Sequence, residues 1–253
     1  MKKLATYCGL AALAGAAFFV GDALGALGDV VSSFPSPLTP TGSSGLAWDG
    51  AYLWSCNPPR TYFYCISTIG TIVTSFNIGA SYGEYDGATY DGEYLWYVEH
   101  ISFQPAYYIR STKTGSCVNW FIFGDYGFAG LAAEKGCLWT GMAFRPLGIL
   151  GVKLTSTGSW LSSFKTPFDL ADLAWDGHYL WSCGPGHYMY QMTTKGSITA
   201  SFPVPGLMGS RATTFDGEYL WVENPDVGWF YQIDIDVVGV APASLGRVKA
   251  LFE

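Results

Sequence analysis

The chain has 253 residues and a mass of 27.4 kDa, with 49% hydrophobic residues and only 13% Asp, Glu, Lys and Arg. So many apolar residues and so few charges exclude disorder for most of the chain. The formal charge of −7 would repel a phosphate backbone, which argues against nucleic acid as a partner. The 32 glycines and the 17% aromatic residues favour an all-β domain with many tight turns.

Residues 1–26 have the three parts of a secretory signal peptide. Lys2 and Lys3 precede an apolar run over residues 4–20, and small residues follow it. The alternative is an N-terminal membrane anchor, but this run is at the short limit for crossing a bilayer. We therefore expect removal of this segment and no stable membrane span in the mature protein. The mature protein is expected to be secreted, to the extracellular space, the periplasm or the cell surface.

A motif that ends in Leu-Trp recurs five times, at intervals of roughly 40 residues. Its first copy is Gly45-Leu-Ala-Trp-Asp-Gly-Ala-Tyr-Leu-Trp54. The other copies span 87–96, 130–139, 172–181 and 212–221. This period, with an Asp-Gly turn between two apolar runs, is typical of a β-propeller that has one four-stranded blade per repeat.

Four strands are predicted per repeat, named a, b, c and d in chain order. The motif supplies strand a, the a–b turn and the start of strand b, and a variable loop and a Tyr-rich strand c follow. The c–d turn contains a glycine, and strand d has a phenylalanine six positions later, as in Gly70 and Phe76. In four copies Asp-Gly is expected to form a type I′ turn, whereas Glu134-Lys135-Gly136 in the third copy must turn differently.

The last repeat lacks its strand d, and the missing strand is found at the other end of the mature chain. The segment Gly28-Asp-Val-Val-Ser-Ser-Phe34 matches Gly70-Thr-Ile-Val-Thr-Ser-Phe76 in spacing and residue character. We therefore predict that the N-terminal strand, at about 28–35, completes the last blade and closes the ring. The predicted domains are the signal peptide 1–26, the propeller 28–236 and a tail 237–253. The predicted blades span 45–79, 86–123, 129–166, 171–204, and 211–236 together with 28–35.

These repeats resemble those of five-bladed β-propellers, and the Asp-Gly-x-Tyr-Leu-Trp pattern is similar in style to secreted bacterial propellers of the NHL and YVTN groups. The resemblance covers residues 28–236 and implies an all-β fold of five four-stranded antiparallel blades. Propellers of this kind include carbohydrate-binding lectins, lyases, cyclotransferases and interaction platforms, so the fold does not determine the function. None of their catalytic motifs is visible in this sequence.

The two faces of such a ring are predicted to differ. The a–b and c–d turns form one face, and the repeated aspartates there are interpreted as turn formers rather than as calcium ligands or catalytic acids. The repeated tryptophans are interpreted as residues that pack one blade against the next, rather than as a sugar-binding set. The b–c loops form the other face and vary between repeats, so binding specificity is expected on this b–c face.

The candidate ligand-binding residues lie in the predicted b–c loops: Arg60, Glu99, His100, Arg145, His187 and Glu223. One interpretation is that Glu99 with the adjacent His100 supplies a general acid or base, with Arg145 holding a carboxylate and Glu223 across the channel. The composition of five such loops favours the other interpretation for any one of them, namely an ordinary solvated loop residue. The 3 histidines and the cysteines show no metal-binding spacing, so we expect no metal site and no cofactor.

Removal of the signal peptide leaves an odd number of cysteines, so at least one is free or pairs between molecules. Cys56 and Cys65 lie in strands b and c of one predicted hairpin and are candidates for a pair, while Cys117 and Cys137 would need a longer reach. The tail 237–253 is either a sorting signal, or a frayed terminus or short helix.

We expect the mature chain to act as a binding module for an extracellular glycan or an extracellular protein. The alternative is an enzyme of the lyase or cyclotransferase type with its site on the b–c face. Two converging carboxylates, or a carboxylate beside His100, would favour the enzyme, whereas a flat aromatic or polar face would favour binding.

Overall fold

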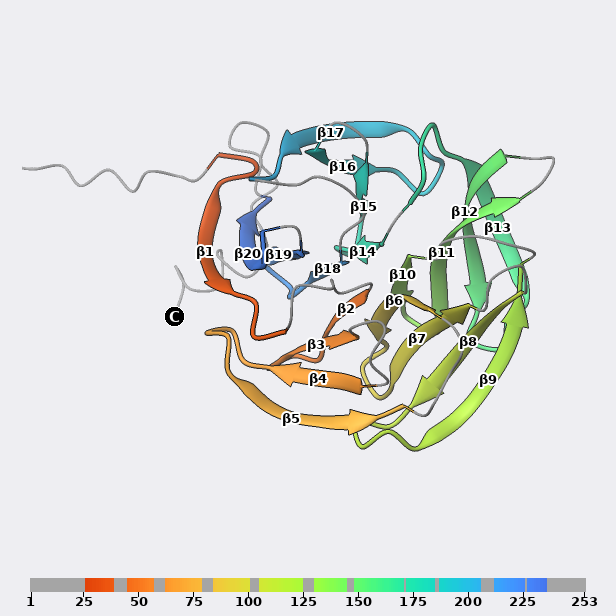
Figure 1. Ribbon diagram of the computed structural model, residues 1–253. Coiled ribbons are helices and arrows are strands. Elements are labelled where there is room, and N and C mark those ends of the chain that lie inside the picture. The colour runs from red at the N-terminus through yellow and green to blue at the C-terminus, as the bar shows by residue number, and fades with distance from the viewer. Residues whose placement is uncertain are drawn as a thin grey trace, which may run out of the picture.

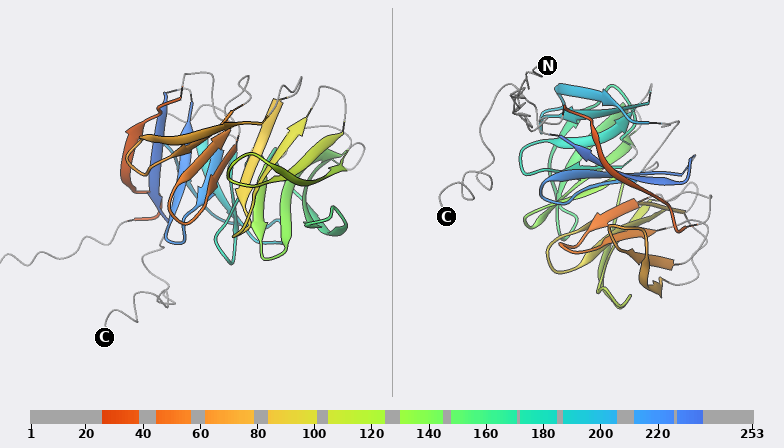
Figure 2. Two further views of the ribbon diagram at one scale, coloured as in Figure 1. Left: turned by 90° about the horizontal axis from the view of Figure 1, so that it is seen from below. Right: turned by 90° about the vertical axis from the view of Figure 1, so that its left-hand side faces the viewer.

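The computed structural model is a ring of five four-stranded antiparallel sheets, which confirms the predicted five-bladed β-propeller (Figure 1). Seen from the side, the sheets stand around a central axis and form a short, thick disc (Figure 2). No helix long and apolar enough to cross a membrane occurs in the part of the chain that the structure describes. The structure describes residues 26–38, 45–56, 62–78, 84–100, 105–124, 130–144, 148–170, 172–184, 187–205, 212–225 and 227–235.

In each blade the strands run in order from the centre of the ring to its rim. Blade 1 contains β2 (Gly45–Trp48), β3 (Leu53–Cys56), β4 (Tyr62–Ile66) and β5 (Ile72–Asn77). Blade 2 contains β6 (Glu84–Tyr90), β7 (Leu95–His100), β8 (Ala106–Ser111) and β9 (Cys117–Phe123). Blade 3 contains β10 (Leu131–Glu134), β11 (Cys137–Phe144), β12 (Gly148–Thr155) and β13 (Trp160–Lys165).

Blade 4 contains β14 (Ala174–Trp175), β15 (Leu180–Gly184), β16 (Tyr188–Met192) and β17 (Ile198–Pro203). Blade 5 contains β18 (Ala212–Phe215), β19 (Tyr219–Asn224), β20 (Trp229–Asp234) and, as its outermost strand, β1 (Val30–Pro35). The innermost strands β2, β6, β10, β14 and β18 contact one another in sequence around the axis, and β18 contacts β2 again.

The ring is closed by the first strand of the chain, as the sequence predicts. β1 pairs antiparallel with β20, with Phe34 opposite Phe230 (Figure 1). The Phe34 ring stacks on the Phe230 ring with 4.9 Å between centroids, and only 7% of Phe34 is exposed. Strands from opposite ends of the sequence therefore make up one sheet, and no gap is left between the last blade and the first.

The glycine before strand d and the phenylalanine within it recur in every blade because the two residues pack against each other across neighbouring blades. Gly70 has a φ of +85°, and a Cβ on it would lie 2.7 Å from Cδ2 of Phe34 in the preceding blade. Gly28 repeats the arrangement, because a Cβ there would lie 2.6 Å from Cγ of Phe202. Each phenylalanine thus packs over the glycine that precedes strand d of the next blade, where only glycine leaves room. The other pairs are Phe76 with Gly115, Phe121 with Gly158, and Phe164 with Gly196.

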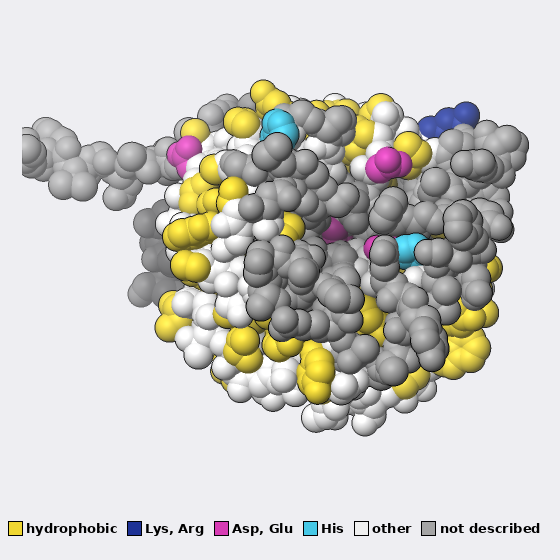
Figure 3. All heavy atoms as spheres, viewed as in Figure 1, with side chains coloured by type: hydrophobic (Ala, Val, Ile, Leu, Met, Phe, Trp, Pro, Cys, Tyr) yellow, Lys and Arg dark blue, Asp and Glu magenta, His cyan; other side chains and the backbone are white. Residues whose placement is uncertain are grey.

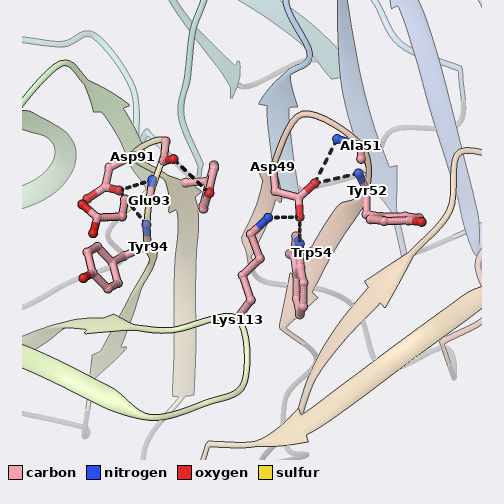
Figure 4. A network of polar contacts seen from close by, with 10 residues as sticks. Asp49, Ala51, Tyr52, Trp54, Asp91, Glu93, Tyr94 and Lys113 are labelled. Carbon is pink, nitrogen blue, oxygen red and sulfur yellow. Dashed lines mark hydrogen bonds and ion pairs between the residues drawn. The ribbon is translucent and has the colours of Figure 1, made fainter.

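The aspartates of the a–b turns join two parts of the repeat (Figure 4). Asp49 Oδ1 accepts hydrogen bonds from the backbone N–H groups of Ala51 and Tyr52, and Oδ2 accepts one from Trp54 Nε1 at 2.8 Å. The turn is not of type I′, because four residues separate the paired ends Trp48 and Leu53 and only the glycine has a positive φ. The same bonds link the other aspartates to their tryptophans: Asp91 with Trp96, Asp176 with Trp181, and Asp216 with Trp221.

Blade 3 keeps the tryptophan contact with a shorter turn. Lys135 and Gly136 alone join Glu134 to Cys137, which confirms that this copy turns differently. The longer glutamate side chain still accepts a hydrogen bond from Trp139 Nε1, at 2.6 Å. The five tryptophans are at most 3% exposed, so their interpretation as core residues is confirmed.

The suggested Cys56–Cys65 disulfide does not form. Cys65 lies opposite Trp54 in the b–c ladder and Cys56 lies opposite Phe63, so the two side chains are out of register. Both side chains are buried, and no disulfide links Cys56, Cys65, Cys117 or Cys137 to another cysteine of the described residues.

Candidate functional site

The structure describes four of the six predicted site residues. Arg60 and Arg145 lie outside the described residues. Glu99 and His100 are the last two residues of β7 rather than part of a loop. His187 directly precedes β16, is exposed and has a φ of 69°. Glu223 lies within β19, one residue before its end.

One interpretation of the sequence makes Glu223 a solvated loop residue, and the structure contradicts it. Only 1% of it is exposed, because the pleat of β19 directs it towards blade 1. Its Oε2 accepts a hydrogen bond from Ser55 Oγ of blade 1, and its Oε1 accepts one from Ser36 Oγ, both at 3.1 Å. Glu223 is therefore a buried carboxylate at the junction of the last blade with the first.

His100 has a carboxylate partner, but the partner is Asp86 and not Glu99. Adjacent residues of a strand point to opposite faces, so Glu99 and His100 cannot act together as the sequence suggested. The Nδ1 atom of His100 lies 2.6 Å from Asp86 Oδ2. The exposed fractions of these side chains are 14% for His100 and 7% for Asp86, so the pair is largely shielded from solvent.

A β-bulge places Asp86 in this position. The pairing of β6 with β7 shifts between Tyr85 and Gly87, so Asp86 has no direct partner in the ladder. The extra residue bends the strand locally and redirects the side chain. Sequence analysis missed Asp86, although a signal was available. The position before the repeat motif holds an acidic residue in this copy only, with Ser44, Ala129, Ala171 and Arg211 in the others.

A buried hydrogen bond between Tyr108 and Thr140 joins blade 2 to blade 3. Tyr108 is fully buried, and its hydroxyl shares a hydrogen bond of 2.8 Å with Thr140 Oγ1. Burial raises the pKa of Tyr108 and the nearby charge of Asp86 adds to this, while the Thr140 hydrogen bond acts in the opposite direction. The phenol therefore stays protonated, and its hydroxyl is held by Thr140 of the neighbouring blade.

A third carboxylate, Asp172, lies among the innermost strands. It is fully buried, and its oxygens accept the backbone N–H groups of Leu131 at 3.2 Å and of Thr213 at 2.8 Å. Leu46 and Leu173 also donate backbone N–H groups to it. Burial raises the pKa of Asp172 well above its usual range, and these hydrogen bonds only partly offset the effect.

Asp172 replaces a small residue of the repeat. The corresponding positions of the other copies hold Gly45, Gly87, Gly130 and Ala212. The innermost strands approach closely here, because a Cβ on Gly45 would lie 2.4 Å from the backbone nitrogen of Ala88. The single aspartate therefore fills the narrow centre of the ring and accepts hydrogen bonds from blades 1, 3, 4 and 5.

Acidic and histidine side chains gather near the middle of one face of the ring (Figure 3). His187 is exposed and directly precedes β16 of blade 4, whereas the histidine of the shielded pair is His100 of blade 2. No group of three or more His, Cys, Asp or Glu side chains that could hold a metal ion occurs in the described part of the chain. The described site therefore consists of a shielded histidine–carboxylate pair with further buried carboxylates in the same ring.

No protein-family model and no curated protein sequence matches the chain. Among solved structures it is similar to the glutaminyl cyclase of Myxococcus xanthus, with 10% identity, a TM-score of 0.67, and coverage of 84% of this chain and 97% of that one. It is also similar to virginiamycin B lyase from Staphylococcus aureus, with 13% identity, a TM-score of 0.50, and coverage of 81% and 99%. A gluconolactonase from Xanthomonas campestris has 12% identity, a TM-score of 0.51, and coverage of 81% and 98%. At these identities the similarity establishes the fold alone.

Proposed function

We propose that this protein is an enzyme whose acid–base group is His100, held by Asp86 at the b–c face of the propeller. The observation that carries the proposal is the 2.6 Å separation between His100 Nδ1 and Asp86 Oδ2. The carboxylate fixes the orientation of the imidazole and stabilises its protonated form, so that Nε2 can accept and return a proton. This is the arrangement that favours catalysis over simple binding.

The shielding of the pair supports the same proposal. Asp86 is less exposed than His100, so the histidine is the member of the pair that reaches a ligand. Removal from water strengthens the interaction between the carboxylate and the imidazolium, compared with an exposed pair. A lyase or cyclotransferase needs a group of this kind, because both reactions move one proton from the substrate and return one to a leaving group or nitrogen.

The known reactions of proteins with this fold supply the panel for a test. The panel contains a peptide with an N-terminal glutamine, virginiamycin B and gluconolactone, after the names of the three similar structures. We expect turnover of at least one of them, and a loss of about 100-fold or more in kcat for His100→Gln and for Asp86→Asn. His187→Gln is the matched control, because His187 is an exposed histidine outside the pair. Equal turnover by wild type and both variants would refute the proposal, and so would no turnover of any panel member by wild type.

A second candidate function is a secreted bacterial module that binds an extracellular glycan or protein, in the style of the NHL and YVTN propellers. The observation that favours it is a set of exposed aromatic side chains at the start of strand c, which includes Tyr62, Tyr188 and Trp229. Their large rings lie at the surface where a ligand can contact them. Export is tested by expressing the full chain and determining the mature N-terminus. A new terminus close to residue 26 is expected, and an intact Met1 on exported protein would contradict it.

A further inference from the structure

Three blades present an aromatic residue at the same place on their surface. Tyr62, Tyr188 and Trp229 are the first residues of β4, β16 and β20, the c strands of blades 1, 4 and 5. Their exposed fractions are 40%, 39% and 37%. Single exposed aromatic residues are common on protein surfaces, but here the exposure recurs at the same strand position in three blades.

A second aromatic residue follows two positions later on the same face of each strand. The ring centroids of Tyr62 and Tyr64 are 6.1 Å apart, and those of Tyr188 and Tyr190 are 6.2 Å apart. The inner members Tyr64, Tyr190 and Tyr231 are half-buried and pack against the core shared with the preceding blade. Packing fixes the inner ring, and the inner ring supports the exposed one beside it.

An exposed serine completes each group. Ser75, Ser201 and Ser33 lie directly opposite Tyr64, Tyr190 and Tyr231 on the neighbouring strand d. All three serines are exposed. Residues directly opposite each other in an antiparallel pair share one face of the sheet, so each serine lies on the face of the two rings, directly opposite the inner one.

Formal charge is nearly absent from these surfaces. The c and d strands of blades 1, 4 and 5 contain no lysine, arginine or glutamate, and Asp234 is their one acidic residue, at the far end of β20. Such a surface offers a charged ligand no opposite charge in exchange for its hydration. It is complementary to a ligand that is also uncharged, with apolar ring faces and hydroxyl groups.

Blades 2 and 3 lack this combination of two aromatic residues and an exposed serine. Blade 3 has Leu150 and Val152 at the two aromatic positions, and Leu150 is only 4% exposed. Blade 2 has Tyr107 and Ile109, with Trp120 in place of the serine. Blades 4, 5 and 1 are consecutive in the ring, so the three complete sets lie side by side on one arc of the disc.

We propose that blades 4, 5 and 1 each carry a binding site for one unit of a neutral carbohydrate, formed by the two aromatic rings and the serine. The exposed ring stacks on the C–H face of a sugar ring, and the serine hydroxyl exchanges hydrogen bonds with a sugar hydroxyl. Three equal sites on one arc fit a polysaccharide with repeated units, because the second and third contacts then form within one complex. The inference rests on the second proposed function and does not depend on the Asp86–His100 site.

The test measures binding of neutral polysaccharides, namely laminarin, galactomannan and dextran, by affinity electrophoresis and calorimetry, with alginate as the anionic comparison. Each of Tyr62→Ala, Tyr188→Ala and Trp229→Ala is expected to weaken binding of one neutral polymer by about tenfold. The triple variant is expected to lose about 100-fold or more. Tyr52→Ala is the matched control, because Tyr52 is 38% exposed but lies in an a–b turn. Thermal melting verifies that all five variants remain folded.

Each other outcome has a definite meaning. Neutral-polymer binding that the triple variant retains in full would overturn the three sites while leaving glycan binding intact. Binding to alginate alone would overturn the assignment of a neutral carbohydrate, and binding to a peptide array but to no polysaccharide would overturn the carbohydrate assignment altogether. Both outcomes would leave the binding function. No binding to any of these would overturn both.

Discussion

The ammonium group of Lys113 lies 2.6 Å from Asp49 Oδ2, which joins the c–d turn of blade 2 to the a–b turn of blade 1 (Figure 4). In other blades a residue of strand c beside the tryptophan contacts the acidic group of the turn: Arg110 with Asp91, Lys153 with Glu134, and Gln232 with Asp216. Blade 1 has Cys65 at this position, opposite Trp54. Lys113 therefore replaces, from the neighbouring blade, a contact that blade 1 does not make itself.

Replacement of Lys113 by methionine is expected to lower the free energy of unfolding by about 1–2 kcal/mol at pH 7, because Asp49 loses a charged donor. Burial alone raises the pKa of Asp49, but the bonds from Lys113, Trp54 and two backbone N–H groups outweigh it and lower the pKa. A lowered folded-state pKa contributes stability above the unfolded value, near 3.8, and loses it as the pH falls through the folded value. The deficit of Lys113→Met should therefore shrink below about pH 4.

Urea unfolding of both proteins between pH 2 and 7 measures this effect. Lys195→Met is the matched control, because Lys195 is an exposed lysine in the c–d turn of blade 4. A deficit that stays constant over the whole pH range would show that Lys113 acts through packing rather than through Asp49.

Substitution of Gly28 by alanine is expected to destabilise the protein more than substitution of Gly217. Both glycines have a positive φ, of 93° and 106°, so backbone strain of about 1–2 kcal/mol is common to the two variants. A Cβ on Gly28 also meets Phe202, whereas a Cβ on Gly217 meets nothing within 4 Å. Overpacking adds about 1–3 kcal/mol to the Gly28 variant alone. Denaturant unfolding measures the difference, and equal losses would argue against the contact that joins the N-terminal segment to blade 4.

Replacement of Asp172 by alanine is expected to cost more than about 3 kcal/mol, because several buried N–H groups lose their acceptor. Asp172→Asn keeps one acceptor oxygen and should cost less. The folded-state pKa of Asp172 is raised, so its protonation favours the folded state. The free energy of unfolding of wild type relative to Asp172→Asn should therefore be greatest below pH 3.8 and should fall as the pH rises towards the folded-state pKa. Unfolding curves of the three proteins at pH 4 and pH 8 test both statements. An alanine variant as stable as wild type would refute the role of the carboxylate.

The thiols should react in the order of their exposure. Cys117 is exposed, whereas burial and the charge of Asp49 raise the pKa of Cys65 to about 11. At pH 8 iodoacetamide should therefore modify Cys117 in the folded protein and Cys65 only after unfolding. Peptide mapping by mass spectrometry identifies the modified residues. Modification of Cys65 in folded protein as rapidly as Cys117 would contradict the burial of strand β4.

The sequence alone predicts the fold because the features that build it recur in every blade. The Asp-to-Trp spacing corresponds to a hydrogen bond within each a–b turn, and the Gly-to-Phe spacing corresponds to a contact between neighbouring blades. Repetition multiplies a weak local signal, so the five copies together indicate a propeller. The match of residues 28–34 to strand d also predicts the closure of the ring.

The candidate site is harder to predict from the sequence, because its residues stand where one copy of the repeat differs from the others. Asp86 is directed to His100 by a bulge, and a one-residue shift of register leaves no trace in a periodic pattern. Glu223 was placed after strand b, but the strand continues beyond it and its carboxylate is buried. Asp172 accepts hydrogen bonds from blades far apart in the sequence, which only the assembled ring brings together.

The pairing of β1 with β20 also sets the order of events when the chain is made. The outermost strand of blade 5 is synthesised first among the strands, and its partner is synthesised last. β1 must therefore wait, with the backbone groups that pair with β20 unsatisfied, until the strands of blades 1 to 4 and the rest of blade 5 have been made. Blades 1 to 4 can assemble during synthesis, but the circle is completed only after translation has reached the end of blade 5.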